Sequence, residues 1–357
     1  MDPLKSLCHI SKEQIGELAM KCAMIGLGMV SGTYAQAILN SADVTLDLIY
    51  SRTSDSREAF VQQWPNLGAC AANDIGEIIA SDVDFVIVTT PPNARLDIVE
   101  RLARAGKPIL MEKPVERNLE NACDLVDICA QHDVCLGIML QHRARPIVHQ
   151  LRRLLDDLGD IRVVEVSVPW WRDQSYYDAP GRGTYTRDGG GVMISQAIHT
   201  LDLMLSLTGP VKTVSALAAT SKSHQMEAED FVSAGLRFAS GAVGHLFATT
   251  SAYPGRGETI TLHCAEGSVT LDAGTLKIDW RDGRTQTLGQ TATSGAGADP
   301  MAFTSDWHQW VIEDFAKSIA ENRPCLVTGE EALKVHALID ALERSSKSGT
   351  ICTVKAG

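Results

Sequence analysis

The sequence lacks an apolar run of the length that a membrane-spanning helix needs. Its first residues also lack the continuous apolar stretch of a secretory signal, because Glu13 and Glu17 interrupt them. We therefore expect neither a membrane protein nor a secreted one, and we treat residues 1–19 as an extension that precedes the folded part.

Cysteines at metal-ligand or redox spacing are absent as well. The nine cysteines contain no CxxC motif, and the six-residue spacing of Cys123, Cys129 and Cys135 fits no zinc pattern. Such a scatter is typical of reduced thiols in a cytoplasmic protein. We therefore expect a cytoplasmic location and no metal site.

Basic residues are outnumbered by acidic ones. The chain has 32 lysines and arginines and 44 aspartates and glutamates, which gives a formal net charge of -12. Nucleic acids and anionic membranes usually require a basic face on their partners. Neither is expected as a partner here. A ligand that carries phosphate needs only a local basic pocket, which this balance does not exclude.

Short apolar runs alternate with helical patterns from residue 20 to about residue 142. Apolar strands separated by helices form a parallel sheet that is covered on both faces. This segment is therefore predicted to be an α/β domain. The expected strands are 22–26, 44–50, 84–89, 108–111 and 135–140, and the expected helices are 33–40, 55–63, 95–105 and 119–132.

The pattern changes in residues 143–357, where strands with partly alternating polarity and Gly/Asp turns predominate. This predicts an α+β domain with a mostly antiparallel open sheet. The expected strands are 161–169, 211–218, 231–238, 241–249, 258–264 and 268–272. The expected helices include 148–156, 303–321 and 330–345, and residues 289–300 are expected to form a small-residue loop. We allow for the C-terminal helix packing back against the first domain.

A glycine-rich turn follows the first expected strand and leads into a helix, with the sequence GLGMVSG over residues 26–32. Glycines let the chain turn tightly and let backbone N–H groups approach a pyrophosphate at a helix N-terminus. At this junction the motif predicts a Rossmann dinucleotide-binding domain over residues 20–142, although such a turn can also serve packing alone. The expected cofactor contacts are Gly26, Gly28, Met29 and Val30.

The end of the second strand bears on which dinucleotide binds. NAD sites usually place an acidic residue there, where it accepts hydrogen bonds from the ribose hydroxyls. This chain has Ser51 and Arg52 instead. Because an arginine can bind a 2′-phosphate, we assign both residues to cofactor binding and prefer NADP, with NAD as the alternative if the arginine is merely solvated.

Two more motifs stand at the carboxyl ends of expected strands, where parallel sheets bind ligands. TTPPN spans residues 89–93, and EKP spans residues 112–114. Partial burial would lower the pKa of Lys113, so that this lysine can exchange a proton with a substrate hydroxyl. Either motif taken alone could be an ordinary turn. The residues assigned to cofactor binding are Thr90, Pro91, Pro92, Asn93, Glu112 and Lys113.

A second glycine run, over residues 189–191, precedes an apolar helix. Ser195, His199 and Asp202 are spaced i, i+4 and i+7, which puts them on one face beside a core-facing apolar stripe. A lone histidine there would more often be a core residue, but the glycines and polar neighbours favour an active-site histidine. The residues assigned to substrate binding are Ser195, Gln196 and His199.

Aromatic and arginine side chains gather in the region that joins the two domains. Aromatic rings cover the C–H faces of sugars, and arginines donate to hydroxyls or phosphates. The tryptophans could equally belong to the core or to an oligomer contact. The residues assigned to substrate binding here are Arg143, Trp171, Tyr177 and Arg182.

In this order, the motifs GLGM, TPPN, MEKP and DGGG…H..D resemble those of the glucose–fructose oxidoreductase and inositol dehydrogenase family, Gfo/Idh/MocA, from about Met20 onward. The resemblance implies an NAD(P) cofactor, a catalytic pair formed by Lys113 and His199, and an oligomer contact through the open sheet. The chain departs from the family at Ser195, where an aspartate is frequent, and at Arg95, where many members have a histidine. The first departure weakens the case for a Lys–Asp–His trio.

The sequence therefore predicts an oxidoreductase that transfers a hydride between nicotinamide and a secondary alcohol of a sugar, polyol or nucleotide-sugar. Lys113 would relay the hydroxyl proton, and His199 would bind or assist. We expect a homodimer or a homotetramer. Two alternatives stay open, namely a regulatory protein that binds a dinucleotide without turnover, and a reductase of C=C or C=N bonds.

Overall fold

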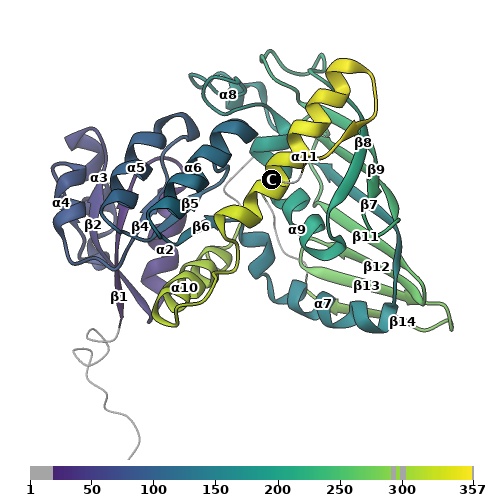
Figure 1. The fold of residues 1–357 in the computed structure, drawn as a ribbon, viewed down its shortest axis with the longest axis horizontal. Coiled ribbons are helices and arrows are strands. Elements are labelled where there is room, and N and C mark those ends of the chain that lie inside the picture. The colour runs from purple at the N-terminus through teal and green to yellow at the C-terminus, as the bar shows by residue number, and fades with distance from the viewer. Residues whose placement is uncertain (1–18, 291–294, 298–302, 356–357) are drawn as a thin grey trace, which may run out of the picture.

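The fold is taken from a computed structural model that describes residues 19–290, 295–297 and 303–355. It consists of two sheet-based units that lie side by side (Figure 1). The expected N-terminal extension, apart from residue 19, and most of the expected 289–300 loop lie outside the described residues. Within the described residues, no helix is both long enough and apolar enough to cross a membrane.

The first domain is built on a six-stranded sheet whose neighbouring strands are all parallel. Its strands are β1 (Met20–Ile25), β2 (Val44–Tyr50), β3 (Cys70–Ala71), β4 (Phe85–Val88), β5 (Ile109–Glu112) and β6 (Leu136–Met139). The strand order is β3-β2-β1-β4-β5-β6, so the chain switches direction between β1 and β4. Ligands bind beyond the carboxyl ends of strands at such a switch point. The predicted Rossmann fold is confirmed.

Helices cover this sheet, because each presents an apolar stripe to the strands and a polar face to solvent. They are α2 (Ser31–Asn40), α3 (Ser54–Gln63), α4 (Ile75–Ala80), α5 (Leu96–Arg104) and α6 (Leu119–Gln131). Side chains of Thr53, Asp74 and Asn118 cap the first turns of α3, α4 and α6. Strand β3 and helix α4 were not predicted, since elements of two and six residues are too short to show a clear period.

The second domain contains a nine-stranded mixed sheet in the order β14-β13-β12-β11-β7-β10-β9-β8-β15. Among the described strands of this sheet, only β7 and β10 pair in parallel, so the predicted mostly antiparallel sheet is confirmed. Its strands are β7 (Ile161–Pro169), β8 (Val211–Ala219), β9 (Phe231–Phe238), β10 (Val243–Thr249), β11 (Thr259–Cys264), β12 (Gly267–Asp272), β13 (Thr275–Trp280), β14 (Thr285–Gly289) and β15 (Cys352–Thr353). The hairpin of β13 and β14 was not expected.

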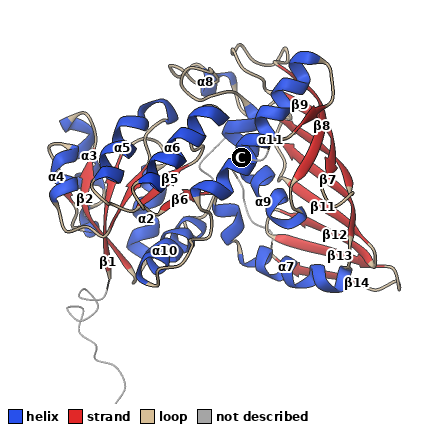
Figure 2. Cartoon of the chain, viewed as in Figure 1, coloured by secondary structure: helices blue, strands red, loops and turns tan. Residues whose placement is uncertain are grey.

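Three long helices lie on the side of this sheet that faces the first domain, and none of the described helices lies on the opposite side (Figure 2). The helices of this part of the chain are α7 (Pro146–Leu158), α8 (Gln174–Tyr177), α9 (Ile198–Thr208), α10 (Asp306–Ala320) and α11 (Gly329–Ser348), and α7, α9 and α11 are the three on the sheet. The large apolar side chains exposed on the strands are Val163, Leu217 and Val243. Serine, threonine and charged side chains occupy most other exposed strand positions, so the uncovered face is largely polar.

Helix α10 belongs to the second half of the chain but packs against α2 of the first domain. Phe315 meets Phe85 of β4 edge-on at 5.4 Å between ring centroids. Val311 and Ile312 join the same buried cluster. This packing fixes α10 beside the carboxyl ends of the first sheet, where it contributes side chains to the site described next.

Candidate active site

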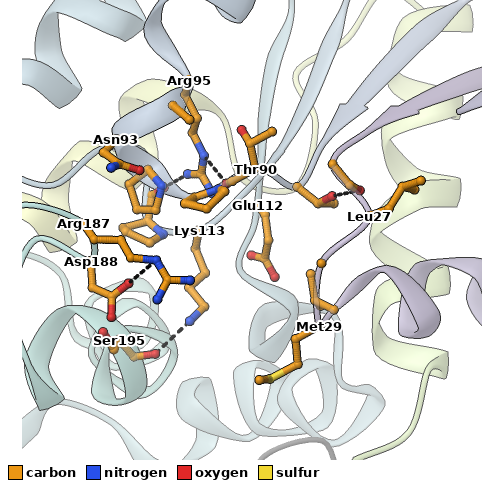
Figure 3. A pocket seen from close by; sticks show the side chains of 18 of the residues that line it. Leu27, Met29, Thr90, Asn93, Arg95, Glu112, Lys113, Arg187, Asp188 and Ser195 are labelled. Atoms are coloured by element: carbon orange, nitrogen blue, oxygen red, sulfur yellow. Dashed lines mark hydrogen bonds and ion pairs between the residues drawn. The ribbon is translucent and has the colours of Figure 1, made fainter. Parts of the chain in front are cut away.

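A cleft of about 770 Å³ opens where the carboxyl ends of β1, β2, β4 and β5 face the second domain. This volume is in the range of cofactor and substrate pockets. Figure 3 shows side chains of both domains converging on it. Most of the expected site residues line it: Gly26, Gly28, Met29, Val30, Ser51, Arg52, Thr90, Pro91, Pro92, Asn93, Glu112, Lys113, Arg182, Ser195, Gln196 and His199.

The glycine turn is shaped by close packing against the TTPPN loop. Gly26 has φ +104°, and a Cβ atom there would lie 2.9 Å from both Thr89 Oγ1 and the Thr90 backbone nitrogen. The Thr89 hydroxyl instead donates to the Gly26 carbonyl at 2.6 Å. Helix α2 begins beyond this turn without a side-chain cap, so its first N–H groups suit an anionic ligand.

Buried polar atoms nearby also fit a dinucleotide. Among the described residues, the Thr90 hydroxyl and Glu112 Oε2 have no hydrogen-bond partner. Buried groups of this kind are normally satisfied, so both are available for hydrogen bonds with a dinucleotide in the cleft. The turn at Gly26 lets the backbone approach a bound dinucleotide closely, and the Thr90 hydroxyl and Glu112 can form hydrogen bonds with it.

Arg95 fixes the two loops that follow β4 and β5. Its side chain is buried, and its Nε and Nη2 atoms donate to the Thr90 carbonyl at 3.0 and 2.8 Å. Its Nη1 atom donates to the Pro114 carbonyl. Burial lowers the pKa of Arg95 to about 10, which leaves it charged at neutral pH. The sequence marked Arg95 only as a departure from the family pattern, and its clamping role depends on contacts that no local motif reveals.

Lys113 extends from the end of β5 into the cleft (Figure 3). Its Nζ atom donates to the Ser195 backbone carbonyl of the second domain at 2.8 Å. Burial lowers the pKa of Lys113; the charge of Glu112 opposes this shift, whereas the charge of Arg182 adds to it. A lysine with a lowered pKa is partly neutral nearer to physiological pH, which suits a proton acceptor.

Ser195 lies in a π-helical turn, Met193–Ala197, that leads into α9. The wider turn rotates Ser195 relative to His199 and Asp202, which keep their i, i+3 spacing within α9, so the three residues do not share one regular helical face. Ser195 and His199 line the cleft, whereas Asp202 does not. The contact with Lys113 also comes from the serine backbone rather than from its hydroxyl.

Asp202 binds Arg143 instead, through two hydrogen bonds of 2.7 and 2.6 Å that involve both carboxylate oxygens. Both side chains are almost completely buried. The structure therefore does not place Arg143 at the substrate, where the sequence analysis had put it. Arg143 ties the segment after β6 to α9 from behind the cleft, and it also contacts Glu331 of α11.

Three histidines contribute buried imidazoles to the cleft. His199 stacks on His142, with ring centroids 5.0 Å apart. Burial lowers the pKa of His199 well below the usual value, and the charge of Lys113 adds to this shift. A neutral His199 can orient a hydroxyl by hydrogen bonding but carries little positive charge at pH 7.

His308 of α10 is the third histidine, and it was not predicted as a site residue. Neither of its ring nitrogens has a hydrogen-bond partner among the described residues, although the side chain is buried. Burial lowers its pKa to about 3, so the ring is neutral. Its position in the first domain's site depends on α10 packing back, which the local pattern of residues 303–321 does not encode.

At the substrate end of the cleft, two of the predicted substrate-binding residues are wrong by one position in the sequence. Trp170, Arg172 and Tyr176 line the cleft, whereas Trp171 and Tyr177 do not. Residues 170–172 continue the extended course of β7, since their backbone groups bond to the end of β10 and the residues after it. Successive side chains of an extended segment point to opposite sides, so Trp171 turns away from its two neighbours.

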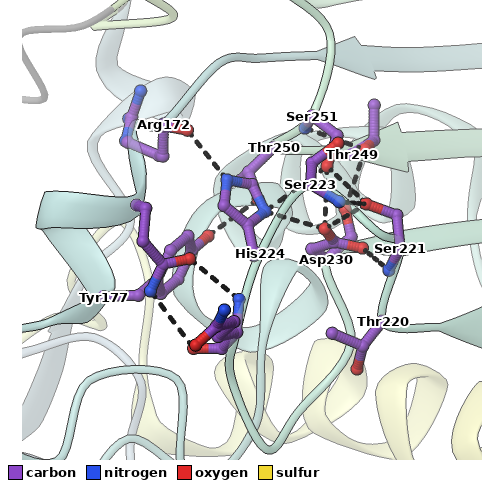
Figure 4. Close-up of polar contacts among 12 residues, drawn as sticks. Arg172, Tyr177, Thr220, Ser221, Ser223, His224, Asp230, Thr249, Thr250 and Ser251 are labelled. Carbon is purple, nitrogen blue, oxygen red and sulfur yellow. Dashed lines mark hydrogen bonds and ion pairs between the residues drawn. The ribbon is translucent and has the colours of Figure 1, made fainter.

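Tyr177 instead packs against His224 in a buried polar cluster (Figure 4). The Trp171 ring also contacts His224, at 6.1 Å between centroids. The Tyr177 hydroxyl lies 2.7 Å from that of Thr250. At the centre, His224 Nδ1 lies 2.7 Å from Asp230 and its Nε2 lies 2.9 Å from the Arg172 carbonyl. Hydroxyls of Ser221 and Ser251 also donate to Asp230. This cluster supports the segment that carries Trp170 and Arg172.

A Rossmann sheet with a glycine turn, an uncapped helix start and a cleft-facing lysine defines the class of dinucleotide-binding oxidoreductases. The comparisons with known proteins agree. Residues 20–140 match the oxidoreductase family with an NAD-binding Rossmann fold, and residues 148–270 match the GFO/IDH/MocA C-terminal domain. The chain belongs to the GFO/IDH/MocA family, as its motifs predicted.

Two of the relatives named here match nearly the whole chain, and a third matches part of it. Inositol 2-dehydrogenase of Rhizobium meliloti is 26% identical over 342 residues, covering 92% of this chain and 97% of the relative. D-xylose 1-dehydrogenase [NADP(+)] of Haloarcula marismortui is 29% identical over 141 residues, or 39% of each chain. The WlbA dehydrogenase of Chromobacterium violaceum, solved with NADH and UDP-GlcNAcA, has a TM-score of 0.80 at 26% identity and covers 95% of this chain and 97% of its own.

Proposed function

We propose that this protein is an NAD(P)-dependent dehydrogenase or reductase that acts on a secondary alcohol or ketone of a sugar, polyol or nucleotide-sugar. The bound dinucleotide supplies the hydride acceptor or donor. Lys113 carries the proposal, because its lowered pKa and its place at the end of β5 suit a group that accepts the hydroxyl proton. His199 and Gln196 hold the substrate from the second domain, and the relatives named above act on compounds of this class.

An assay of NAD(P)H absorbance with polyols, sugars and UDP-sugars tests this function. We expect cofactor turnover with at least one member of the panel. A protein that binds the dinucleotide but turns over none of these compounds would instead support the regulatory alternative. Turnover confined to compounds with C=C or C=N bonds would support the other alternative.

The cofactor preference proposed is for NADP. Ser51 and Arg52 line the cleft at the end of β2. The acidic residues that line the cleft are Glu112, at the end of β5, and Asp188, so neither lies at the end of β2, where an NAD site usually has an acidic residue. By isothermal titration, NADP is expected to bind at least as tightly as NAD. Arg52→Ala should weaken NADP binding roughly tenfold to a hundredfold, as expected for a lost charge-assisted hydrogen bond, and leave NAD binding nearly unchanged.

The matched control is Arg104→Ala, which removes an exposed arginine of α5 that pairs with Glu100 outside the cleft. It should change neither affinity. A clear preference of the unaltered protein for NAD would contradict the assignment of Ser51 and Arg52.

We also propose that two or four copies associate through the uncovered face of the nine-stranded sheet. Val243 and Val163 are direct neighbours in register on β10 and β7, and both are exposed. Light scattering should give a mass at least twice the 38.5 kDa of one chain. Val243→Glu should lower that mass, because it buries a charge in the contact. A single species of 38.5 kDa for the unaltered protein would refute the assembly.

The location proposed is the cytoplasm, where a reducing environment suits the buried thiols of Cys22, Cys129, Cys264 and Cys325. Neither nucleic acid nor membrane is proposed as a partner.

A further inference from the structure

Positive charge gathers at the substrate end of the cleft. Arg172, Arg182 and Arg187 all line this end, and Asp188 is the acidic residue beside them. The whole chain carries a net charge of -12, so this local balance is the reverse of the overall one. A cleft with low-dielectric walls and an excess of one charge concentrates ligands of the opposite charge.

Arg182 has a neutral partner in place of a carboxylate. Its Nη1 donates to the Tyr176 hydroxyl at 3.2 Å, and its guanidinium stacks over the Tyr176 ring at 5.0 Å. Among the described residues, no carboxylate oxygen lies within ion-pair distance of Arg182. The side chain is half-buried, so its charge is only partly hydrated. An anion in the cleft would complete its interactions.

Arg187 is only weakly compensated. Its Nη1 donates to the Pro180 carbonyl at 2.7 Å, and its Nε lies 4.0 Å from Asp188 Oδ1. The other carboxylate oxygen of Asp188 accepts from the Gly183 backbone at 3.0 Å. One carboxylate that is shared in this way cannot balance both arginines. Figure 3 shows Arg187 directed toward the part of the cleft that holds Lys113.

Gln196 adds the complementary polar group. Its Nε2 donates to the Tyr176 hydroxyl at 3.4 Å, so that oxygen receives hydrogen bonds from both Gln196 and Arg182. Gln196 Oε1 has no partner among the described residues, and the side chain is only 4% exposed. A buried, unpaired acceptor that shares the Tyr176 hydroxyl with Arg182 fits a ligand that presents a hydroxyl next to an anionic group.

We infer that the substrate is an acidic sugar derivative, whose carboxylate or phosphate binds Arg182 and Arg187 while a neighbouring hydroxyl binds Gln196. This inference rests on the proposed function and specifies its substrate class. With the anionic group held there, the reacting carbon faces Lys113 and His199. The charge of the ligand would also offset that of Arg182, which otherwise helps to keep the pKa of Lys113 low.

Binding to the NADP complex tests the inference independently of turnover. Glucuronate, glucose 6-phosphate and UDP-glucuronate are titrated against glucose as the neutral probe. At least one acidic compound should bind at least tenfold more tightly than glucose. Arg182→Gln should reduce that affinity about tenfold to a hundredfold and weaken glucose binding much less, and Arg182→Lys should restore part of the lost affinity.

The three acidic probes separate a sugar carboxylate, a phosphate and a nucleotide diphosphate as the source of the charge, and a gain with any one of them supports the inference. Arg162→Gln, at an exposed position of β7 remote from the cleft, is the matched control and should bind like the parent. Equal affinity for glucose and for every acidic probe, or acidic binding that Arg182→Gln does not change, overturns the inference. If the inference is overturned in this way but glucose is turned over, the proposed function stands. If an acidic probe binds as expected but no compound is turned over, only the proposed function is contradicted.

Discussion

Lys113→Ala is expected to lower kcat by about a hundredfold to ten-thousandfold while dinucleotide binding persists, which is the usual cost of removing a positioned proton acceptor. Lys113 reaches the cleft from the end of β5, whereas the glycine turn that holds the dinucleotide belongs to β1 and α2. The two functions are therefore separable. Kinetics on a confirmed substrate, with titration of the dinucleotide, make the comparison.

Ser195→Ala and His199→Ala are the matched comparisons for Lys113. Ser195→Ala should have a mild effect, because Lys113 bonds to the serine backbone and not to its hydroxyl. His199→Ala should reduce kcat less than Lys113→Ala and raise KM more, since a neutral imidazole mainly orients the substrate. Near-normal kcat in Lys113→Ala would contradict the proton relay and favour a reductase of C=C or C=N bonds.

The pH dependence of the reaction follows from the same lysine. Alcohol oxidation requires neutral Lys113, so kcat/KM should rise as pH increases through the pKa of that group. Because burial lowers this pKa, the rise should lie below the ordinary lysine value of 10.5. In Lys113→Ala this limb of the pH profile should be absent.

Asp202→Ala should lower the free energy of unfolding by about 3–5 kcal/mol, because it leaves the Arg143 guanidinium buried without its main partner. Asp202 holds Arg143 through two hydrogen bonds in a site that is almost closed to solvent. The weaker contact of Arg143 with Glu331, at 3.3 Å, compensates only partly. Urea unfolding of the variant and the parent gives the difference.

Asp279→Ala, which removes an exposed aspartate of β13, is the control and should change the free energy of unfolding by less than about 0.5 kcal/mol. The double variant Arg143→Met/Asp202→Leu should recover much of the loss, since it removes both buried charges. If Asp202→Ala unfolds within about 1 kcal/mol of the parent, the pair has no large role in stability.

The cofactor half of the site could be predicted because its signals are local. Gly26, the loop after β4 and Lys113 each follow a strand that the apolar pattern marks, and a parallel sheet aligns the carboxyl ends of its strands. The chain order of the motifs then indicated the family. Strands β2, β7 and β9 also have the predicted bounds, since turns or charged residues delimit each run.

The substrate half depended on features that the sequence pattern does not contain. Asp202 lies one turn beyond His199 on α9 and does not reach the cleft. The alternation of side chains along the extended segment after β7 turns Trp171 away, whereas Trp170 and Arg172 line the cleft. His308 entered the site only because α10 crosses back to the first domain. These errors share a cause, since each depends on phase or on long-range packing rather than on residue type.

Transfer of label from the cofactor tests the central claim most directly. NADPH carrying deuterium at C4 of the nicotinamide, in each stereochemical form, is incubated with the protein and a panel of keto-sugars, and the products are examined by mass spectrometry and NMR. We expect one of the two forms to deliver a single deuterium to the carbon that becomes the secondary alcohol, and Lys113→Ala to slow this transfer about a hundredfold or more. Bound NADPH that transfers no deuterium to any keto-sugar, or transfers it only to C=C or C=N compounds, would contradict the account.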